Sequence, residues 1–404
     1  MRSVTVLRLM LVGLLVLLQS IDLSDSFALL ARTPLWILPA IIMNGLFALA
    51  GFTIARSQDH NGPKVALGRT AWRFLPALVV VVLSTALIAG AALTVQRRAI
   101  YFSDALVWTY LLNILGYPQN FLPGVFLNNN IPSSINAITW AIPVSYFGIA
   151  IVMLAGRRWR FGSLLLASAA IFGVILGVLL QFDLLPSRVS SSLVWLAGGR
   201  ALNGAIAFLA GALAYRERAK LVVDSRIATL IALGTVAFSL FGEKRLLESA
   251  IVGPVVAIGA AYVALFLGSL RLPLRHAVLR SEPLLWRVFL LAYPVQQLWI
   301  AVGPDRQGVW LNMALSVPVI VLSAGAMWYG LELPLLRRLA PATVANHPAY
   351  EVQDRPMRQG RVLDPIATMR AALPHIVAAV VIVLLTLAAI AIAVFALQRD
   401  RGGI

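Results

Sequence analysis

Apolar residues along this chain fall into continuous runs, separated by short segments that carry most of the charge. A run of about 20 apolar residues is long enough to cross a bilayer as a helix. A membrane β-barrel would instead show shorter segments of alternating polarity. The pattern therefore predicts an all-α, polytopic transmembrane helix bundle with about 11 spans. The predicted spans are 4–23, 34–55, 73–95, 137–155, 161–181, 191–215, 226–241, 249–269, 284–303, 309–333 and 371–397.

These runs divide the chain into three parts. Residues 1–336 contain the first ten predicted spans and are interpreted as one transmembrane domain. The segment 337–370 combines Pro, Gln and mixed charge, which predicts a cytoplasmic linker. The last run contains almost no polar residue, so 371–404 is expected to form a peripheral C-terminal transmembrane helix with a short tail.

The connection 96–136 is the longest between the early spans, and it has two parts. The first, YFSDALVWTYLLNILGY, is apolar but too short and too dotted with polar groups to form a span. Trp108 and the tyrosines suit the headgroup level, so this part either lies in the membrane interface or re-enters the membrane. The second part is rich in Asn and Pro, which predicts an ordered or mobile loop.

Composition and charge agree with a multi-pass membrane protein. The 404 residues are 60% hydrophobic and 12% charged, and the mean hydropathy is +0.88. Basic residues gather in alternate loops, which accounts for the net charge of +17 without nucleic-acid binding. The positive-inside tendency then places the N-terminus in the cytoplasm and the C-terminus outside, as in a bacterial inner membrane. There is no cysteine, and the four histidines lie in loops or at a helix end, so no metal site is expected.

The first run is unusual because it carries Arg8, Gln19 and Asp22. Arg8 and Gln19 are eleven residues apart, which is about three turns or roughly 16 Å along a helix axis. They therefore share a face of the helix, and Asp22 follows one turn later near that face. Polar groups inside a span are costly and face a protein interior or a watery cavity. This polar stripe is either a reaction centre or a set of helix-packing contacts.

Six short stretches occur in order along the first ten spans: NGLFALAGFTIAR, WRFLPAL, INAITWAIPVS, FLAGALAYR, AYPVQQLWI and WYGLELPLLRR. Together they resemble the motifs of acyltransferase family 3, a family of integral membrane proteins. The resemblance implies transfer of an acyl group, commonly acetyl, from cytoplasmic acyl-CoA to a hydroxyl of a carbohydrate or lipid-linked glycan. Acetyl-CoA would be the co-substrate, and membrane lipid would surround the protein.

The family carries an Arg in its first span and, eleven residues later, a catalytic His, which matches Arg8 and Gln19 here. Glutamine has no useful basicity, so it can neither take a proton from a sugar hydroxyl nor carry an acyl group. Asp22 is the nearest group able to act as a base, unless it simply marks the end of the span in water. The rest of the implied catalytic set is Asn136, Trp140, Ser145 (in place of the family's Glu) and Gln297.

Three further residues are candidates for holding acyl-CoA. Arg69 and Arg73 are expected near the cytoplasmic face, where arginines can hold phosphates through bidentate contacts or can simply set the topology. Glu332 either lines the path by which acyl-CoA enters or forms a solvated pair with Arg337 or Arg338.

Several of these residues also have plain structural interpretations. Asn136 and Trp140 are expected to begin a span, where Trp also serves as an interface anchor. Gln296 and Gln297 can act as hydrogen-bonding contacts between helices. Arg200, inside a predicted span, is either functional or turned outward to water.

Three functions remain open at this point. The leading one is a membrane O-acyltransferase. The second is a catalytically degenerate relative that binds glycan or acts as a scaffold subunit in polysaccharide assembly. The third is a small-molecule transporter, favoured only by the number of spans and by Arg200.

Overall fold

The computed structural model describes residues 2–24, 30, 32–156, 159–185, 199–270, 281–302 and 308–334. Within these ranges the chain is helical, and the only bridge between extended segments joins Phe121 to Ser134. The all-α prediction is therefore confirmed for the described residues. Seven helices in them are long and apolar enough to cross a membrane: Ser3–Leu23, Pro34–Asn61, Pro63–Leu93, Phe161–Gln181, Val252–Ser269, Glu282–Ala301 and Val309–Glu332.

The predicted number of about 11 spans is not confirmed. Three of the predicted spans correspond to shorter helices, namely α8 (Ala141–Ala155), α11 (Arg200–Arg216) and α12 (Ser225–Phe241). The predicted linker 337–370 and the predicted span 371–397 lie outside the described residues.

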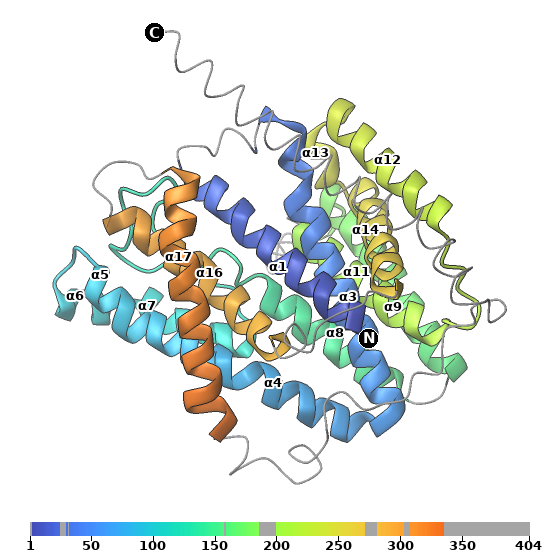
Figure 1. Ribbon diagram of the computed structural model, residues 1–404, viewed down its shortest axis with the longest axis horizontal. Coiled ribbons are helices and arrows are strands. Elements are labelled where there is room, and N and C mark those ends of the chain that lie inside the picture. The colour runs from blue at the N-terminus through green and yellow to red at the C-terminus, as the bar shows by residue number, and fades with distance from the viewer. Residues whose placement is uncertain are drawn as a thin grey trace, which may run out of the picture.

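Two helices, α3 (Leu38–Asn61) and α11, form the centre of the bundle (Figure 1). On one side α3 contacts α1 (Arg2–Leu23) and α4 (Pro63–Leu83). On the other side α11 contacts α8, α9 (Trp159–Gln181) and α14 (Val252–Ser269). Beyond α1 lie α16 (Glu282–Val302), α17 (Val309–Ala326) and the π-helical turn η4 (Met327–Glu332).

Glycines allow α3 and α11 to approach each other closely. A Cβ atom on Gly51 would lie 1.9 Å from the carbonyl oxygen of Phe208, and one on Gly211 would lie 1.9 Å from that of Ala48. No larger residue fits either position without moving a backbone. Small residues at such crossings are a general device of helices packed in membranes, where backbone proximity supplies the van der Waals contact.

The turn between α3 and α4 corrects the predicted start of the third span. Gly62, at φ +80°, is the single residue between the two helices, and Pro63 begins α4. Proline suits the first helical turn because its missing N–H has no partner there, and Gly tolerates the positive φ. The helix thus starts ten residues earlier than predicted, so Arg69, which lay before the predicted span, is also part of α4.

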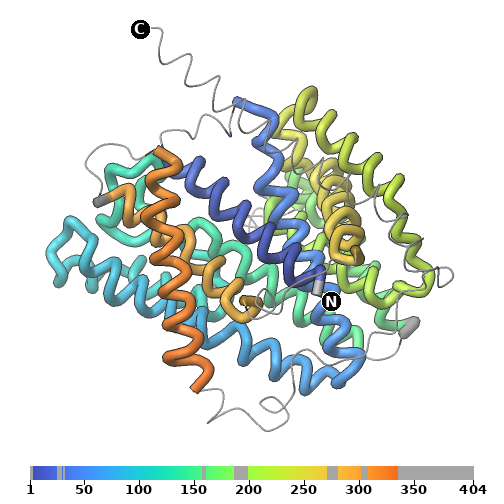
Figure 2. The backbone as a smooth tube through the Cα atoms, viewed as in Figure 1, coloured from blue at the N-terminus to red at the C-terminus, as the bar shows by residue number. Residues whose placement is uncertain are grey.

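The apolar helix continues from α4 through the π-helical η2 (Ser84–Ala89) and α5 (Gly90–Leu93). The chain then turns and returns as α6 (Arg98–Ser103), α7 (Ala105–Leu111) and the 3-10 turn η3 (Leu112–Leu115). Figure 2 shows these three elements running back beside the helix that precedes them. We call residues 98–117 the arm.

The Asn/Pro-rich segment after the arm is an ordered series of turns, and α8 starts only at Ala141. Asn136 and Trp140 therefore precede the helix that they were expected to begin. At the periphery, η1 (Pro34–Ile37) meets α12, where Trp36 Nε1 donates to the carbonyl oxygen of Ser239 at 3.1 Å. The short α13 (Lys244–Leu247) precedes α14.

Candidate functional site

The polar stripe of the first span faces the interior of the bundle over most of its length. Arg8, Leu15 and Gln19 share one face of α1, and the Arg8 side chain is 14% exposed while Gln19 is 8% exposed. Asp22, one turn beyond Gln19, is exposed. Of the two environments that the sequence left open for Arg8 and Gln19, the structure shows the protein interior, whereas Asp22 lies at the open end of the stripe.

Arg8 ties α1 to α3 and α16. Its Nη2 donates to the carbonyl oxygen of Leu49 at 2.7 Å and to Thr53 Oγ1 at 2.5 Å. Its Nη1 donates to Glu282 Oε1 at 3.3 Å, which makes an ion pair at the start of α16. The guanidinium is thus held by three groups from two helices and is fixed in one orientation.

Glu282 also binds Arg73 of α4. Arg73 Nη2 donates to Glu282 Oε1 at 2.7 Å, and Thr5 Oγ1 of α1 donates to Oε2 at 3.1 Å. The carboxylate is 7% exposed, so two arginines meet at a largely desolvated charge. The sequence pattern did not single out Glu282. The available signal was a single acidic residue next to Pro283 in an otherwise basic segment at the start of a span.

A second buried ion pair lies nearby, between Arg287 of α16 and Glu332 of η4. Arg287 Nε donates to Glu332 Oε1 at 2.8 Å, and Nη2 donates to Oε2. The guanidinium carbon lies 4.4 Å from the centre of the Trp328 ring. The Arg287 side chain is fully buried and that of Glu332 is 2% exposed, so Glu332 is not part of a solvated face. Arg287 lies within α16, inside the predicted span 284–303.

Gln19 sits at the other end of the α1 stripe, and its carbonyl oxygen is enclosed. Within the described residues, Gln19 Oε1 has no hydrogen-bond partner. Gln296 of α16 is fully buried and donates from Nε2 to the carbonyl oxygen of Val16 at 2.9 Å, while its own Oε1 lacks a donor among the same residues. An enclosed acceptor left without a donor costs about 1–3 kcal/mol. Gln19 Oε1 on α1 and Gln296 Oε1 on α16 are therefore two enclosed acceptors without a donor among the described residues.

Gln297, the next residue, serves the turn that precedes α8. Its Nε2 donates to the carbonyl oxygens of Ile131 at 3.2 Å and Ser134 at 3.1 Å. Its Oε1 accepts from Asn129 Nδ2 at 2.6 Å. All the hydrogen-bonding groups of this amide are used to hold one loop against α16, as expected for a structural contact.

Three other residues of the predicted catalytic set have local partners. Buried Asn136 donates from Nδ2 to the carbonyl oxygen of Leu290 at 3.2 Å. Trp140 packs against Phe47 with 5.7 Å between ring centres, so it faces α3 rather than anchoring the chain at a membrane surface. Ser145 Oγ donates to the carbonyl oxygen of Ala141 in its own helix at 2.8 Å. These hydrogen bonds and ring contacts do not involve Gln19.

Asp22 lies among cations from other elements. The positive charges of Arg200, the first residue of α11, and of Lys244 in α13 both act on its carboxylate. Arg200 and Lys244 are exposed. Arg200 is therefore exposed at the start of a helix rather than inside a span.

The two arginines that are candidates for holding acyl-CoA, Arg69 and Arg73, both lie on α4 and are partly exposed. The Arg73 side chain is 40% exposed, and its Nη2 forms an ion pair with Glu282. Arg69 is partly exposed one turn earlier on α4. Arg69 and Arg73 thus lie at the same end of the bundle as Arg8 and Glu282. In the part of the chain that the structure describes, no group of three His, Asp or Glu residues is arranged to hold a metal ion.

No protein-family model, no curated protein and no solved structure gives a significant match to this chain. The resemblance to acyltransferase family 3 therefore rests on the short sequence motifs, and the residues they imply are interpreted from the geometry above.

Proposed function

We propose that this protein is a membrane O-acyltransferase-like protein of a bacterial inner membrane. It would transfer an acyl group, acetyl by resemblance, from cytoplasmic acyl-CoA to a hydroxyl of a carbohydrate or lipid-linked sugar. The observation that carries the proposal is the α1 stripe, which has a fixed, charged Arg8 at one end and the enclosed acceptor Gln19 Oε1 at the other. The two are about 16 Å apart along the helix.

The chemistry requires a proton acceptor, and Asp22 is the carboxylate of α1. The acceptor hydroxyl oxygen would bond to the acyl carbon of the thioester while the C–S bond breaks. The hydroxyl proton would pass to the Asp22 carboxylate and then to the departing thiolate, which releases CoA. Gln19 Oε1 would accept a hydrogen bond from the sugar and orient it, because an amide can position a hydroxyl but cannot deprotonate it.

A second candidate function is favoured by the amide at position 19. A catalytically degenerate relative would keep the enclosed acceptors of Gln19 and Gln296 for binding a glycan hydroxyl, without moving an acyl group. Such a protein would act as a glycan-binding or scaffold subunit in polysaccharide assembly.

An acyl-transfer assay on the purified protein in lipid nanodiscs separates the two candidates. The enzymatic proposal predicts CoA release from acetyl-CoA, its loss in Asp22→Asn, and wild-type release in the control Asp183→Asn, which makes the same change at an exposed carboxylate outside α1. Gln19→His is expected to raise CoA release, because an imidazole at position 19 adds a second group, beside Asp22, that can accept the hydroxyl proton. Absence of CoA release in wild type and in Gln19→His, with unchanged surface acetylation on gene deletion, would exclude the enzymatic function.

A further inference from the structure

The arm, residues 98–117, lies at membrane depth. The helix Pro63–Leu93 carries its charges, Lys64, Arg69 and Arg73, in its first half. The apolar remainder, 74–93, has about the length that crosses a hydrocarbon core. The stretch crosses one leaflet with its first half and the other leaflet with its second half. Because η2 lies in the second half, an element that packs on η2 lies within the second leaflet.

The arm packs on that half of the helix and extends towards its middle. Tyr101 Oη donates to the carbonyl oxygen of Ala86 at 2.6 Å, which fixes the start of the arm beside η2. Further along, α7 contacts η2, and η3 contacts α4. The helical part that returns, Ala105–Leu115, is too short to cross a bilayer. The arm therefore enters the membrane and turns back near its centre.

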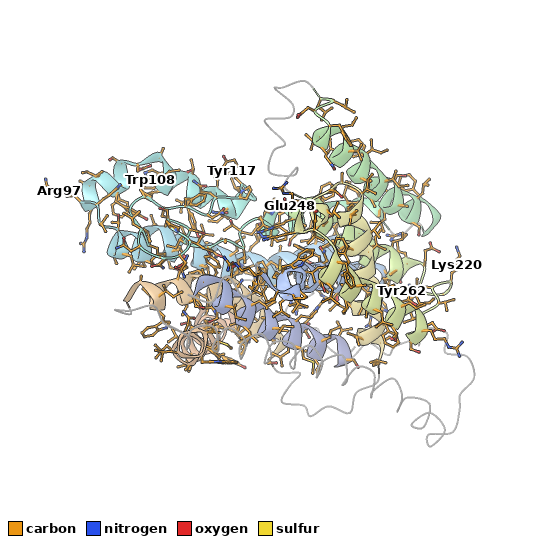
Figure 3. The ribbon with its side chains drawn as sticks, turned by 90° about the horizontal axis from the view of Figure 1, so that it is seen from above. Arg97, Trp108, Tyr117, Lys220, Glu248 and Tyr262 are labelled. Atoms are coloured by element: carbon orange, nitrogen blue, oxygen red, sulfur yellow. The ribbon has the colours of Figure 1, made fainter. Side chains whose placement is uncertain are left out.

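The outer face of the arm is apolar. Large residues on it are exposed: Leu106 by 40%, Trp108 by 52%, Leu112 by 40%, Leu115 by 77% and Tyr117 by 58%. The opposite face, including Val107 and Tyr110, is fully buried against the bundle. Figure 3 shows Trp108 and Tyr117 on the outer side of the arm, while exposed Arg97 marks its far end. In water, an exposed apolar face of this extent would favour aggregation.

The tip of the arm satisfies its own polar backbone groups, as a turn inside a membrane must. Fully buried Asn113 donates from Nδ2 to the carbonyl oxygens of Tyr110 at 2.7 Å and Gln119 at 2.8 Å, and its Oδ1 accepts from the Gln119 amide at 3.1 Å. Gly116, at φ +90°, makes the reversal, and Tyr146 Oη of α8 donates to the carbonyl oxygen of Ile114 at 2.8 Å. The turn thus exposes few unpaired groups to lipid.

We propose that α6, α7 and η3 form a re-entrant arm whose outer face binds the acyl chains of one membrane leaflet. The arm enters and leaves on the same face of the bilayer, with Arg97 and Arg98 at its water-facing end. Its interaction partner is the lipid hydrocarbon itself, continuous with the lipid around the exposed side of the neighbouring helix, where Leu83 and Ile88 are also exposed. This inference does not depend on acyl transfer.

Site-directed spin labelling tests the proposal, and the absence of cysteine means that single-cysteine variants carry no background. Leu112→Cys in the arm is compared with Leu322→Cys, at a residue 73% exposed on the membrane-spanning α17, and with Lys220→Cys, whose native side chain is 80% exposed between α11 and α12. Each full-length variant is labelled and reconstituted into phosphatidylcholine–phosphatidylglycerol vesicles. Collision with oxygen and with a water-soluble nickel chelate is then measured by electron paramagnetic resonance.

The expected result is that the label at position 112 collides with oxygen and avoids nickel, as at 322 and unlike at 220. Nickel accessibility at 112 equal to that at 220 would place the arm in water. Protection from both reagents would show that protein, for example a second copy of the chain, covers the face. Either result overturns the proposal. Leu115→Cys gives the same measurement one turn later if the first variant does not fold.

Discussion

Substitutions of single buried charged residues are expected to lower the stability of the protein most. Arg287 and Glu332 are desolvated together, so removing one partner leaves an uncompensated charge. We expect Glu332→Gln to lose about 3–5 kcal/mol of stability, since breaking a buried pair typically has that cost. The double variant Arg287→Met/Glu332→Leu is expected to be close to wild type, because both charges are removed and similar volume is kept.

Thermal unfolding of the purified variants, followed by the monodisperse fraction after heating, measures this difference. Glu243→Gln, at an exposed carboxylate, is the control and should melt with wild type. A double variant as unstable as Glu332→Gln would show that packing around Trp328, rather than charge, stabilises this region.

The carboxylate of Glu217, just beyond α11, should make stability depend on pH. Its pKa lies below the ordinary value of 4.5. The main cause is a 2.5 Å hydrogen bond from Ser163, and the second is the hydrogen bond from Lys220. A lowered pKa stabilises the folded state above the ordinary value, and the contribution disappears as pH falls through the folded pKa. Ser163→Ala should therefore melt below wild type at pH 7, and the gap should shrink as the pH falls below about 4.

Melting temperatures across this pH range test the linkage. The control is Ser269→Ala, because the Ser269 hydroxyl donates to the carbonyl oxygen of Phe266, which does not titrate. The difference in melting temperature between Ser269→Ala and wild type should not vary with pH. A constant gap for Ser163→Ala would mean that the hydroxyl acts only by packing.

At the scale of helices, the crossing of α3 and α11 depends on the absence of side chains. Gly51→Ala would drive a Cβ atom into the Phe208 carbonyl, and overpacking of this kind costs about 1–3 kcal/mol. Gly13→Ala on α1 meets no atom within 4 Å, so it should be neutral or gain up to about 1 kcal/mol from helix propensity. Equal melting temperatures for the two variants would contradict this account of the crossing.

The tip of the arm is held in place by the side chain of Asn113. Asn113→Leu removes three hydrogen bonds at membrane depth and should destabilise the protein by about 2 kcal/mol or more. Asn61→Leu, at the end of α3, removes a single bond to the carbonyl oxygen of Ser57 and should cost less than half as much. Limited proteolysis in the 94–120 region, compared between the two variants, would show whether the loss is local to the arm.

At the scale of the whole molecule, the bundle predicts which loops share a membrane face. Arg216, at the end of α11, donates to Gln58 Oε1 of α3 at 3.1 Å, so the loop after α11 lies on the side where α3 ends. Val95 follows the apolar helix that starts there, and therefore lies on the opposite side. With the N-terminus in the cytoplasm, as the basic loops indicate, Val95→Cys should react with an impermeant maleimide in intact spheroplasts and Lys220→Cys should not.

Permeabilised cells provide the control, because both cysteines should then react. Reaction of Lys220→Cys alone in intact cells would reverse the orientation without changing the fold. Reaction of both would contradict the bundle arrangement itself.

The period and length of the apolar runs were enough to predict the class of this protein. Membrane spans can be identified from composition because lipid cannot satisfy backbone groups, so each crossing must be a helix of sufficient length. The shared face of Arg8 and Gln19 also followed from helical spacing on one segment. The start of α4 was misplaced, because Gly62 and Pro63 make a one-residue turn that a hydropathy pattern cannot resolve.

The partners of the polar residues were decided by tertiary structure alone. Glu282 meets Arg8 across 274 residues of sequence, and Glu332 meets Arg287 across 45, separations at which no periodic pattern relates two positions. The same holds for the arm, whose apolar composition allowed either an interfacial or a re-entrant course. Its packing against η2 favours the re-entrant course, because depth in a membrane is a property of the element that a segment touches and not of the segment itself.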